Sequence, residues 1–189
     1  MCDTKQEIAS GFKLLMKEKP IKKITVQDLM DALDRKRQSF YYHFQDVYDV
    51  MEWICYREFI SQIKYQEEQS FEEWFDHALS LLESDRLFYK KVIECIDRNR
   101  IVTELLPSVE AQVRRLMRND YFDGPIRKKT KEMDSMIRFV SNSIIYHIIE
   151  YVDRRGNLKP QEIRYLVNYS LKALKFSVEY KSEEHTLAV

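Results

Sequence analysis

The chain has 189 residues, of which only 3 are glycine and 4 are proline, whereas average usage would give roughly 13 glycines. Gly-rich phosphate-binding loops and the G-x-S-x-G nucleophile turn need closely spaced glycines, so these enzyme motifs are excluded. Tight β-hairpins also need residues that accept a positive φ. The 31 basic and 31 acidic residues balance, so the net charge does not indicate a nucleic-acid partner. We therefore expect an all-α protein.

The three cysteines, Cys2, Cys55 and Cys95, form no C-x-x-C pair. This pattern predicts a reducing cytoplasm and no zinc site. The first ten residues lack the apolar core of a signal peptide, and no apolar stretch approaches the roughly 20 residues that span a bilayer. No nucleophile is paired with a base in any recognisable motif. We expect a cytoplasmic protein that is not an enzyme, has no metal or other cofactor, and has no membrane partner.

Apolar periodicity predicts three helices in the N-terminal part of the chain. The first covers residues 4–18 and ends before a Lys-Pro pair. The second covers 24–33, where Thr25 can act as N-cap with an acid at the capping-box spacing of three. After a brief turn at Asp34, a third short helix is predicted over 36–44.

The remainder of the chain is predicted to be helical, with Asp46 as the N-cap of a long helix and one internal loop, which contains Gly124 and Pro125. The expected helices cover residues 46–67, 70–83, 86–98, 102–119, 133–154 and 160–180, and the loop covers 119–132. We divide the chain into an N-terminal domain over 1–46, a larger helical domain over 47–180, and a flexible tail over 181–189.

The most informative segment is residues 24–44, where two short amphipathic helices meet at a tight turn and a third helix precedes them. This is the plan of a helix-turn-helix, whose second short helix enters the major groove of DNA. Arg35, Lys36 and Arg37 stand together where that helix begins. The partial positive charge of a helix N-terminus adds to theirs and favours phosphate.

The pattern T-V-x-D-L-x-x-A followed by R-x-S-F-Y-x-H-F resembles the DNA-binding domain of TetR-family transcription regulators. The matching residues are Thr25, Val26, Asp28, Leu29, Arg37, Ser39, Phe40, Tyr41, His43 and Phe44. The motif covers about 45 N-terminal residues, and the rest of the chain resembles the family in length and helix pattern. The motif R-Q-S-F-Y-Y-H-F-Q-D-x-Y-D, followed by Trp53, resembles the sequences of a branch of this family that contains regulators of dihydroxyacetone kinase operons.

The resemblance implies a role for each matching side chain. Thr25 would cap its helix and touch a phosphate, while Arg37 and Gln38 would approach base edges. Ser39, Tyr41 and His43 would bind phosphates, Tyr42 would reach the backbone or a thymine methyl group, and Phe40 and Phe44 would be core. The full predicted DNA-binding set is Thr25, Arg35, Lys36, Arg37, Gln38, Ser39, Tyr41, Tyr42 and His43. The alternative is that the aromatic stretch only packs, although five such consecutive residues cannot all face inward on a short helix.

Two positions depart from the family pattern. Asp34 occupies the turn where the family usually has glycine in a left-handed conformation, which aspartate tolerates better than most residues. Val47 stands where many members carry a lysine that meets a phosphate. An acid near the DNA face and a lost phosphate contact would each weaken DNA binding.

The resemblance implies that the N-terminal domain over 1–46 binds DNA and that the domain over 47–180 dimerises, and aromatic side chains of the larger domain are expected to line an effector pocket. The predicted pocket residues are Trp53, Tyr56, Phe59, Trp74, Phe88 and Tyr89, and the predicted dimer interface contains Ile144, Ile148, Leu166, Ser170 and Leu174. Ordinary core packing is the alternative for both sets. We therefore predict a homodimeric TetR-type regulator of operator DNA that responds to a small-molecule or protein effector. The alternative function is a protein-interaction co-regulator with a weakened DNA-binding head.

Overall fold

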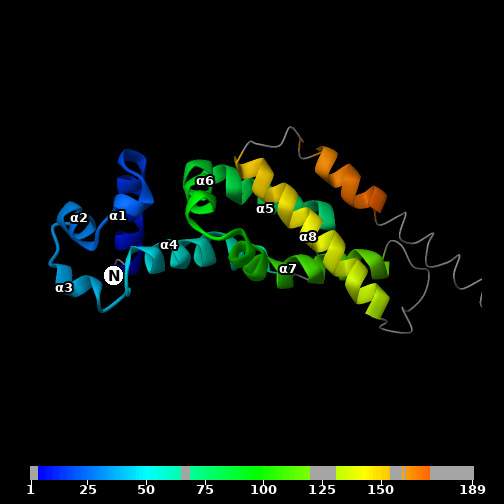
Figure 1. The fold of residues 1–189 in the computed structure, drawn as a ribbon, viewed down its shortest axis with the longest axis horizontal. Coiled ribbons are helices and arrows are strands. Elements are labelled where there is room, and N and C mark those ends of the chain that lie inside the picture. Colours follow the sequence, from blue (N-terminus) through cyan, green and yellow to red (C-terminus); the bar gives the residue numbers. More distant parts are fainter. Residues whose placement is uncertain (1–3, 65–68, 120–130, 154–158, 160, 171–189) are drawn as a thin grey trace, which may run out of the picture. The chain divides into compact units, whose positions relative to one another are not determined.

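The computed structural model describes residues 4–64, 69–119, 131–153, 159 and 161–170. Within these ranges the regular structure is entirely helical and no strand occurs (Figure 1), which confirms the predicted all-α fold. The predicted tail 181–189 and most of the predicted loop lie outside the described ranges. In the part of the chain that is described, no helix is long and apolar enough to cross a membrane.

The chain forms two compact units. The first comprises Met1–Lys64 and His77–Arg98, and the second comprises Tyr65–Asp76 and Asn99–Val189. Helix α5 (Phe71–Ser84) contributes its first residues to one unit and the rest to the other. The first unit therefore extends past residue 46, and the division into domains at that residue stays a prediction.

Three helices open the first unit: α1 (Thr4–Glu18), α2 (Val26–Ala32) and α3 (Arg37–Phe40), with a short 3-10 helix, η1 (Ile21–Lys23), after α1. Helix α1 has the predicted bounds. The prediction for the third helix was too long, because α3 ends at Phe40 rather than Phe44. Beyond it the amide of His43 donates to the Phe40 carbonyl at 2.9 Å, and such i to i+3 bonds tighten the chain into turns.

Helix α2 begins and ends with two recognisable caps. The Thr25 side chain accepts the Asp28 amide and the Asp28 side chain accepts the Thr25 amide, so the predicted capping box is confirmed. At the other end Asp34 has a φ of 51°. The amides of Asp34 and Arg35 donate to the carbonyls of Asp31 (3.2 Å) and Met30 (2.9 Å), which is the hydrogen-bond pattern of a Schellman motif. The turn therefore has the left-handed residue that was predicted.

Gly11 lets α2 approach α1 closely. A Cβ atom at this position would lie 3.1 Å from Leu33 Cδ2 and 3.2 Å from Leu29 Cδ1, with Leu29 fully buried. The absence of a side chain on α1 thus sets how α2, and the turn that follows it, stand against α1.

Helix α4 (Val47–Cys55) begins at Asp46, whose carboxylate accepts the amides of Tyr48 and Asp49, so this predicted cap is confirmed. The predicted helix over 46–67 was too long, because helical structure runs only from Val47 to Ile60. The chain widens at Tyr56–Ile60 into a π-helix, η2, where the Ser61 amide donates to the Tyr56 carbonyl at 2.8 Å. Because this turn contains one extra residue, the buried residue that follows Ile54 is Phe59, five positions later, instead of a residue three or four positions later.

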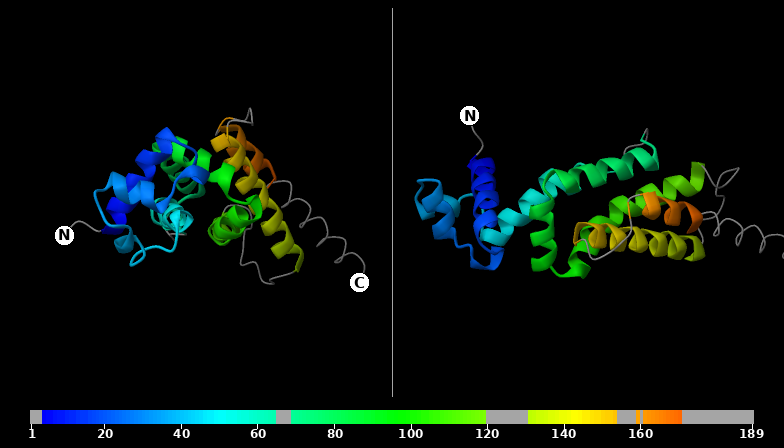
Figure 2. Two further views of the ribbon diagram at one scale, coloured as in Figure 1. Left: turned by 60° about the vertical axis from the view of Figure 1, so that its left-hand side comes forward. Right: turned by 90° about the horizontal axis from the view of Figure 1, so that it is seen from above.

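The remaining helices are α5, α6 (Arg86–Cys95), α7 (Arg98–Asn119) and α8 (Lys131–Asp153), and residues 161–170 are also helical. In the second unit α7 and α8 lie side by side (Figures 1 and 2), joined by ion pairs of Arg114 with Asp134 at 2.9 Å and of Arg138 with Glu110 at 3.2 Å. Arg164 joins the 161–170 segment to Asp76 of α5 at 2.8 Å.

Candidate nucleic-acid interface

Helix α3 and the turn after it present two tyrosines to solvent and bury two phenylalanines. Tyr42 is 77% exposed and Tyr41 50%, whereas Phe40 is 0% exposed and Phe44 3%. Phe40 and Phe44 are therefore core, as predicted, and packing alone does not account for the whole aromatic run. The turn after α3 thus exposes two tyrosine side chains whose hydroxyl groups can form hydrogen bonds.

The buried phenylalanines tie the exposed face to the rest of the unit. The Phe40 ring lies 5.9 Å from that of Phe44, which in turn meets Trp53 of α4 edge-on at 5.9 Å. The ammonium of Lys5 on α1 lies 5.2 Å from the centre of the Phe44 ring. Contacts of this kind hold α3 in one orientation on α1 and α4, because aromatic pairs have preferred geometries.

Arg37 does not point freely into solvent. Its Nε and Nη2 atoms donate to the Tyr41 hydroxyl at 3.1 and 2.9 Å, one helical turn away. Both residues are exposed. The guanidinium is thereby held along the outer face of α3 with its remaining donors open, and this geometry suits recognition of a planar acceptor pair such as the edge of guanine.

The other predicted contacts near the turn separate into three environments. Arg35 pairs with Glu7 of α1 instead of standing with its neighbours. Lys36 is the exposed N-cap residue of α3, and its carbonyl accepts the Ser39 hydroxyl at 2.7 Å. Gln38 is exposed and His43 is half-buried. Arg35 and Arg37 are therefore held by different partners, Glu7 and Tyr41, while Lys36 is exposed between them.

The Thr25 side chain is engaged in the N-cap of α2. Its hydroxyl donates to Asp28 Oδ2 at 2.6 Å, and Lys19 Nζ lies 2.7 Å from the same oxygen. The hydrogen bond from Lys19, followed by those from Thr25, holds the pKa of Asp28 well below its usual range. Lys19 was not in the predicted set, and it carries a charge that is already paired.

The departure at Asp34 leads to a direct test. We expect Asp34→Gly to stabilise the protein by about 1 kcal/mol, because glycine takes a positive φ without the penalty of a side chain, and to raise DNA affinity a few-fold. The exposed carboxylate is removed as well, so Asp34→Asn serves as the matched control: it removes the charge and keeps a residue that tolerates the left-handed region. Urea unfolding and DNA titration of both variants separate the two effects. An affinity that rises in neither variant would show that this acid does not oppose DNA.

Most of the predicted pocket residues are packed in the protein interior. Phe59, Phe88 and Tyr89 are at most 5% exposed, and the Tyr89 ring lies 5.7 Å from Phe59 and 5.2 Å from Phe88. Trp74 is 0% exposed and belongs to the second unit, and Tyr56 is half exposed. Trp53 is covered by Phe44 and Arg57. These contacts are those of core packing, the alternative that the sequence left open, and the pocket stays a prediction.

The thiol of Cys55 next to this aromatic cluster is expected to be inert. Burial, and then the carboxylates of Glu58 and Glu52, raise its pKa to about 12. Since only the thiolate reacts, alkylation of folded protein at pH 8 is expected to be roughly 10³-fold slower at Cys55 than at an unperturbed cysteine. Peptide mass spectrometry after timed iodoacetamide treatment measures the rate, with urea-unfolded protein as the control. Equal rates in the two states would contradict the expectation.

The residues predicted for the dimer interface differ in their exposure to solvent. Ile144 and Ile148 are 0% and 4% exposed within their own chain, so they belong to its core; Leu166 is 39% exposed and Ser170 is half-buried. Leu174 lies outside the described residues. The large apolar side chains that the same elements do turn outward are Phe139 (72% exposed), Tyr146 (52%), Tyr165 (67%) and Tyr169 (62%).

Comparison with known proteins adds two likenesses, and no protein-family model matches the chain. Over 99 residues the chain is 31% identical to the HTH-type dhaKLM operon transcriptional activator DhaS of Lactococcus lactis subsp. lactis (strain IL1403). That match covers 51% of each protein, so the chain spans about half the length of the curated relative it matches.

A solved structure, named as the dihydroxyacetone kinase operon activator DhaS, superposes with a TM-score of 0.70 at 22% identity and covers 93% of this chain and 98% of that one. This likeness shows the all-helical fold. Both relatives are named as transcriptional activators, and neither is named as an enzyme. Neither name specifies the TetR family, which stays a prediction.

Proposed function

We propose that the protein is a TetR-type transcriptional regulator that binds operator DNA through α3 and the adjacent turn. The observation that carries the proposal is the outward set on α3 and the turn after it, where Arg37, Tyr41 and Tyr42 are exposed while Phe40 anchors the helix. A short helix held rigidly by its core face, with arginine and tyrosine on the other, has the chemistry of major-groove recognition. Similarity to activators of a dihydroxyacetone kinase operon supports the same function and suggests the class of target gene.

The proposal includes a homodimer, because two heads are needed to read a two-fold symmetric site. Its support is the set of outward aromatic side chains on α8 and on residues 161–170: Phe139, Tyr146, Tyr165 and Tyr169. Monomers rarely expose many large apolar side chains together. These residues replace Ile144 and Ile148 as the candidates for the interface.

The proposal also includes an effector that binds the helical part beyond the head. Gln112 of α7 supports it: the side chain is 1% exposed, and no described residue forms a hydrogen bond with either polar atom of its amide. A buried amide without partners costs free energy, so such groups are commonly satisfied by a bound polar molecule or by water. A ligand with both donors and acceptors fits this position.

The experiment that tests the function is selection of bound sequences from random double-stranded DNA by the full chain. We expect an enriched inverted repeat whose half-sites lie about one helical turn apart. An enriched single half-site would support DNA binding and contradict the dimer. No enrichment at physiological salt would overturn the proposal.

The alternative, a protein-interaction co-regulator with a weakened head, draws on two observations. Asp34 is an exposed acid beside the recognition helix, and Val47 is 8% exposed at the start of α4, where it packs inward and cannot contact a phosphate. Failure to enrich any DNA sequence, together with a protein that co-purifies with the chain in fixed proportion, would favour this function.

A further inference from the structure

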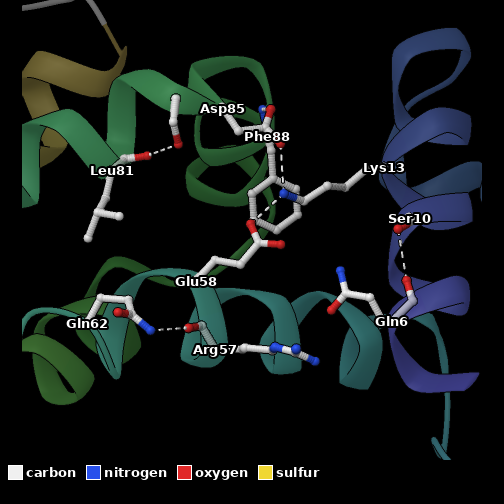
Figure 3. Close-up of polar contacts among 10 residues, drawn as sticks. Gln6, Ser10, Lys13, Arg57, Glu58, Gln62, Leu81, Asp85 and Phe88 are labelled. Carbon is white, nitrogen blue, oxygen red and sulfur yellow. Dashed lines mark hydrogen bonds and ion pairs between the residues drawn. The ribbon is translucent and has the colours of Figure 1, made fainter. Parts of the chain in front are cut away.

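One lysine on α1 joins three separate elements of the first unit. Lys13 Nζ lies 2.5 Å from Glu58 Oε2 and 2.8 Å from Asp85 Oδ2, and it stands 4.9 Å from the centre of the Phe88 ring. Figure 3 shows the ammonium between the two carboxylates with the ring beside it. Glu58 belongs to η2, and Asp85 caps α6. We call these four residues the Lys13 junction.

The junction is partly shielded from solvent, and its charges are firmly held. The Lys13 side chain is 21% exposed and the two carboxylate side chains 32% and 31%. Burial by itself would lower the pKa of Lys13, but the hydrogen bonds to Asp85 and Glu58 outweigh it and raise the pKa. Lysine therefore stays charged here at any physiological pH. Without it, two carboxylates would face each other across the junction.

The π-helix is what brings Glu58 to Lys13. In an unbroken helix the buried positions Val50 and Ile54 would be followed at the regular spacing by residues 57 and 58. The extra residue in η2 instead buries Phe59, at 5% exposure. Glu58 is left at the edge of the core, within reach of α1. π-turns inside helices are frequent at functional positions.

Asp85 is held from its other side. Its Oδ1 accepts the Phe88 amide at 3.4 Å as the cap of α6, which leaves Oδ2 for Lys13. A second lysine, Lys91 of α6, donates to the carbonyl of Met16 on α1. Helix α6 is therefore attached to α1 at two points, which lie three residues apart along α1 and six residues apart along the α6 segment.

Helix α1 also carries the recognition elements. Helix α2 packs against it at Gly11, and Arg35, just before α3, pairs with Glu7. A displacement of α6 or η2 that breaks the Lys13 junction would therefore reach α3 through α1. None of the predicted DNA-contacting residues takes part in the junction.

We propose that Lys13 is a positioning residue for DNA recognition, which fixes the orientation of α1, and of α2 and α3 upon it, relative to η2 and α6. The inference rests on the proposed function and adds a point of regulation to it. An event that moves α6 is transmitted to the recognition helix through the bonds of Lys13 to Glu58 and Asp85.

The test compares Lys13→Met with Lys17→Met, which removes the same charge from an exposed position one turn along α1. Two readouts are used. The first is affinity for the selected operator as a function of salt. The second is the alkylation rate of Cys55, which lies close to Glu58, and this measurement requires no DNA. In Lys13→Met we expect affinity to fall at least about fivefold, in the range of coupling between linked elements, with an unchanged salt slope. Cys55 alkylation should become at least about tenfold faster, because an opened junction exposes the buried thiol; loss of the Lys13 charge alone would act in the opposite direction, since that charge lowers the pKa of Cys55. Lys17→Met should leave the Cys55 rate unchanged, and Lys13→Arg should restore both readouts in part.

The outcomes are distinct. A salt slope that drops by about 0.9 in Lys13→Met, the value for one phosphate, with Cys55 unaffected would make Lys13 a DNA contact and overturn the proposal. Unchanged affinity would also overturn it. Should Lys13→Met not fold, the isosteric pair Glu58→Gln with Asp85→Asn, where asparagine still caps α6, must weaken operator binding in the same direction. If the unmodified chain selects no DNA, the proposed function fails and the positioning role with it, while the Cys55 rate still reports whether Lys13 closes the junction.

Discussion

Replacing Phe40 with alanine is expected to destabilise the protein by about 3–5 kcal/mol, the usual loss for a fully buried phenylalanine. Phe40 is 0% exposed and packs on Phe44 and Tyr41. The four residues of α3 are far too few to be helical in isolation, so their conformation depends on this anchor. We expect the recognition helix to lose its order and DNA binding to be lost with it.

Urea unfolding measures the loss in stability, and amide hydrogen exchange over residues 26–44 locates it. Tyr42→Ala is the matched control, since Tyr42 is an aromatic residue two positions away that is 77% exposed. Exposed substitutions usually change stability by less than about 0.5 kcal/mol. If Phe40→Ala unfolded at the same urea concentration as the control, α3 would not depend on the buried ring, and the rigid display of Arg37 and Tyr41 would need another cause.

The helix-turn-helix could be predicted closely because its signals are local. A capping box at Thr25 and a residue that accepts a positive φ at Asp34 are decided within a few residues of each other, and both are present. The expectation that the aromatic run could not all face inward is also met, since Tyr41 and Tyr42 face solvent. Nothing about distant parts of the chain was needed for these predictions.

The predictions that were wrong, or that stay open, depend on packing between distant segments. The predicted length of the helix that starts at Val47 was wrong because the α-helix gives way to a π-helix at Tyr56. The sequence signal for this change was the spacing of five between the buried residues Ile54 and Phe59. The prediction that Arg35 stands together with Lys36 and Arg37 overlooked its ion pair with Glu7, which is 28 residues away in the sequence. Gln112 was missed although it interrupts an apolar face formed by Val109, Val113 and Leu116. In each case the partner element had to be known first.

Replacing Arg37 with alanine is expected to weaken binding of the selected operator by about 5- to 150-fold for each head, because a bidentate arginine–guanine contact contributes about 1–3 kcal/mol. The exposed guanidinium already has a fixed direction, since Tyr41 accepts from its Nε and Nη2. Tyr41→Phe keeps the ring and releases the guanidinium, so we expect a smaller, few-fold loss. Fluorescence anisotropy with operator and with scrambled DNA measures both variants.

The substitution Arg37→Lys distinguishes a base contact from a phosphate contact. Arg37→Lys keeps the charge but loses the planar fork that matches guanine. If Arg37 reads a base, this variant retains the salt slope and loses preference for one base pair; if Arg37 only neutralises a phosphate, lysine substitutes for it and the preference survives. Because the buried core of α3 is untouched in all three variants, a loss of affinity cannot be attributed to unfolding, which equal urea midpoints would verify. Unchanged operator affinity in Arg37→Ala would show that the one guanidinium of this helix does not contact operator DNA.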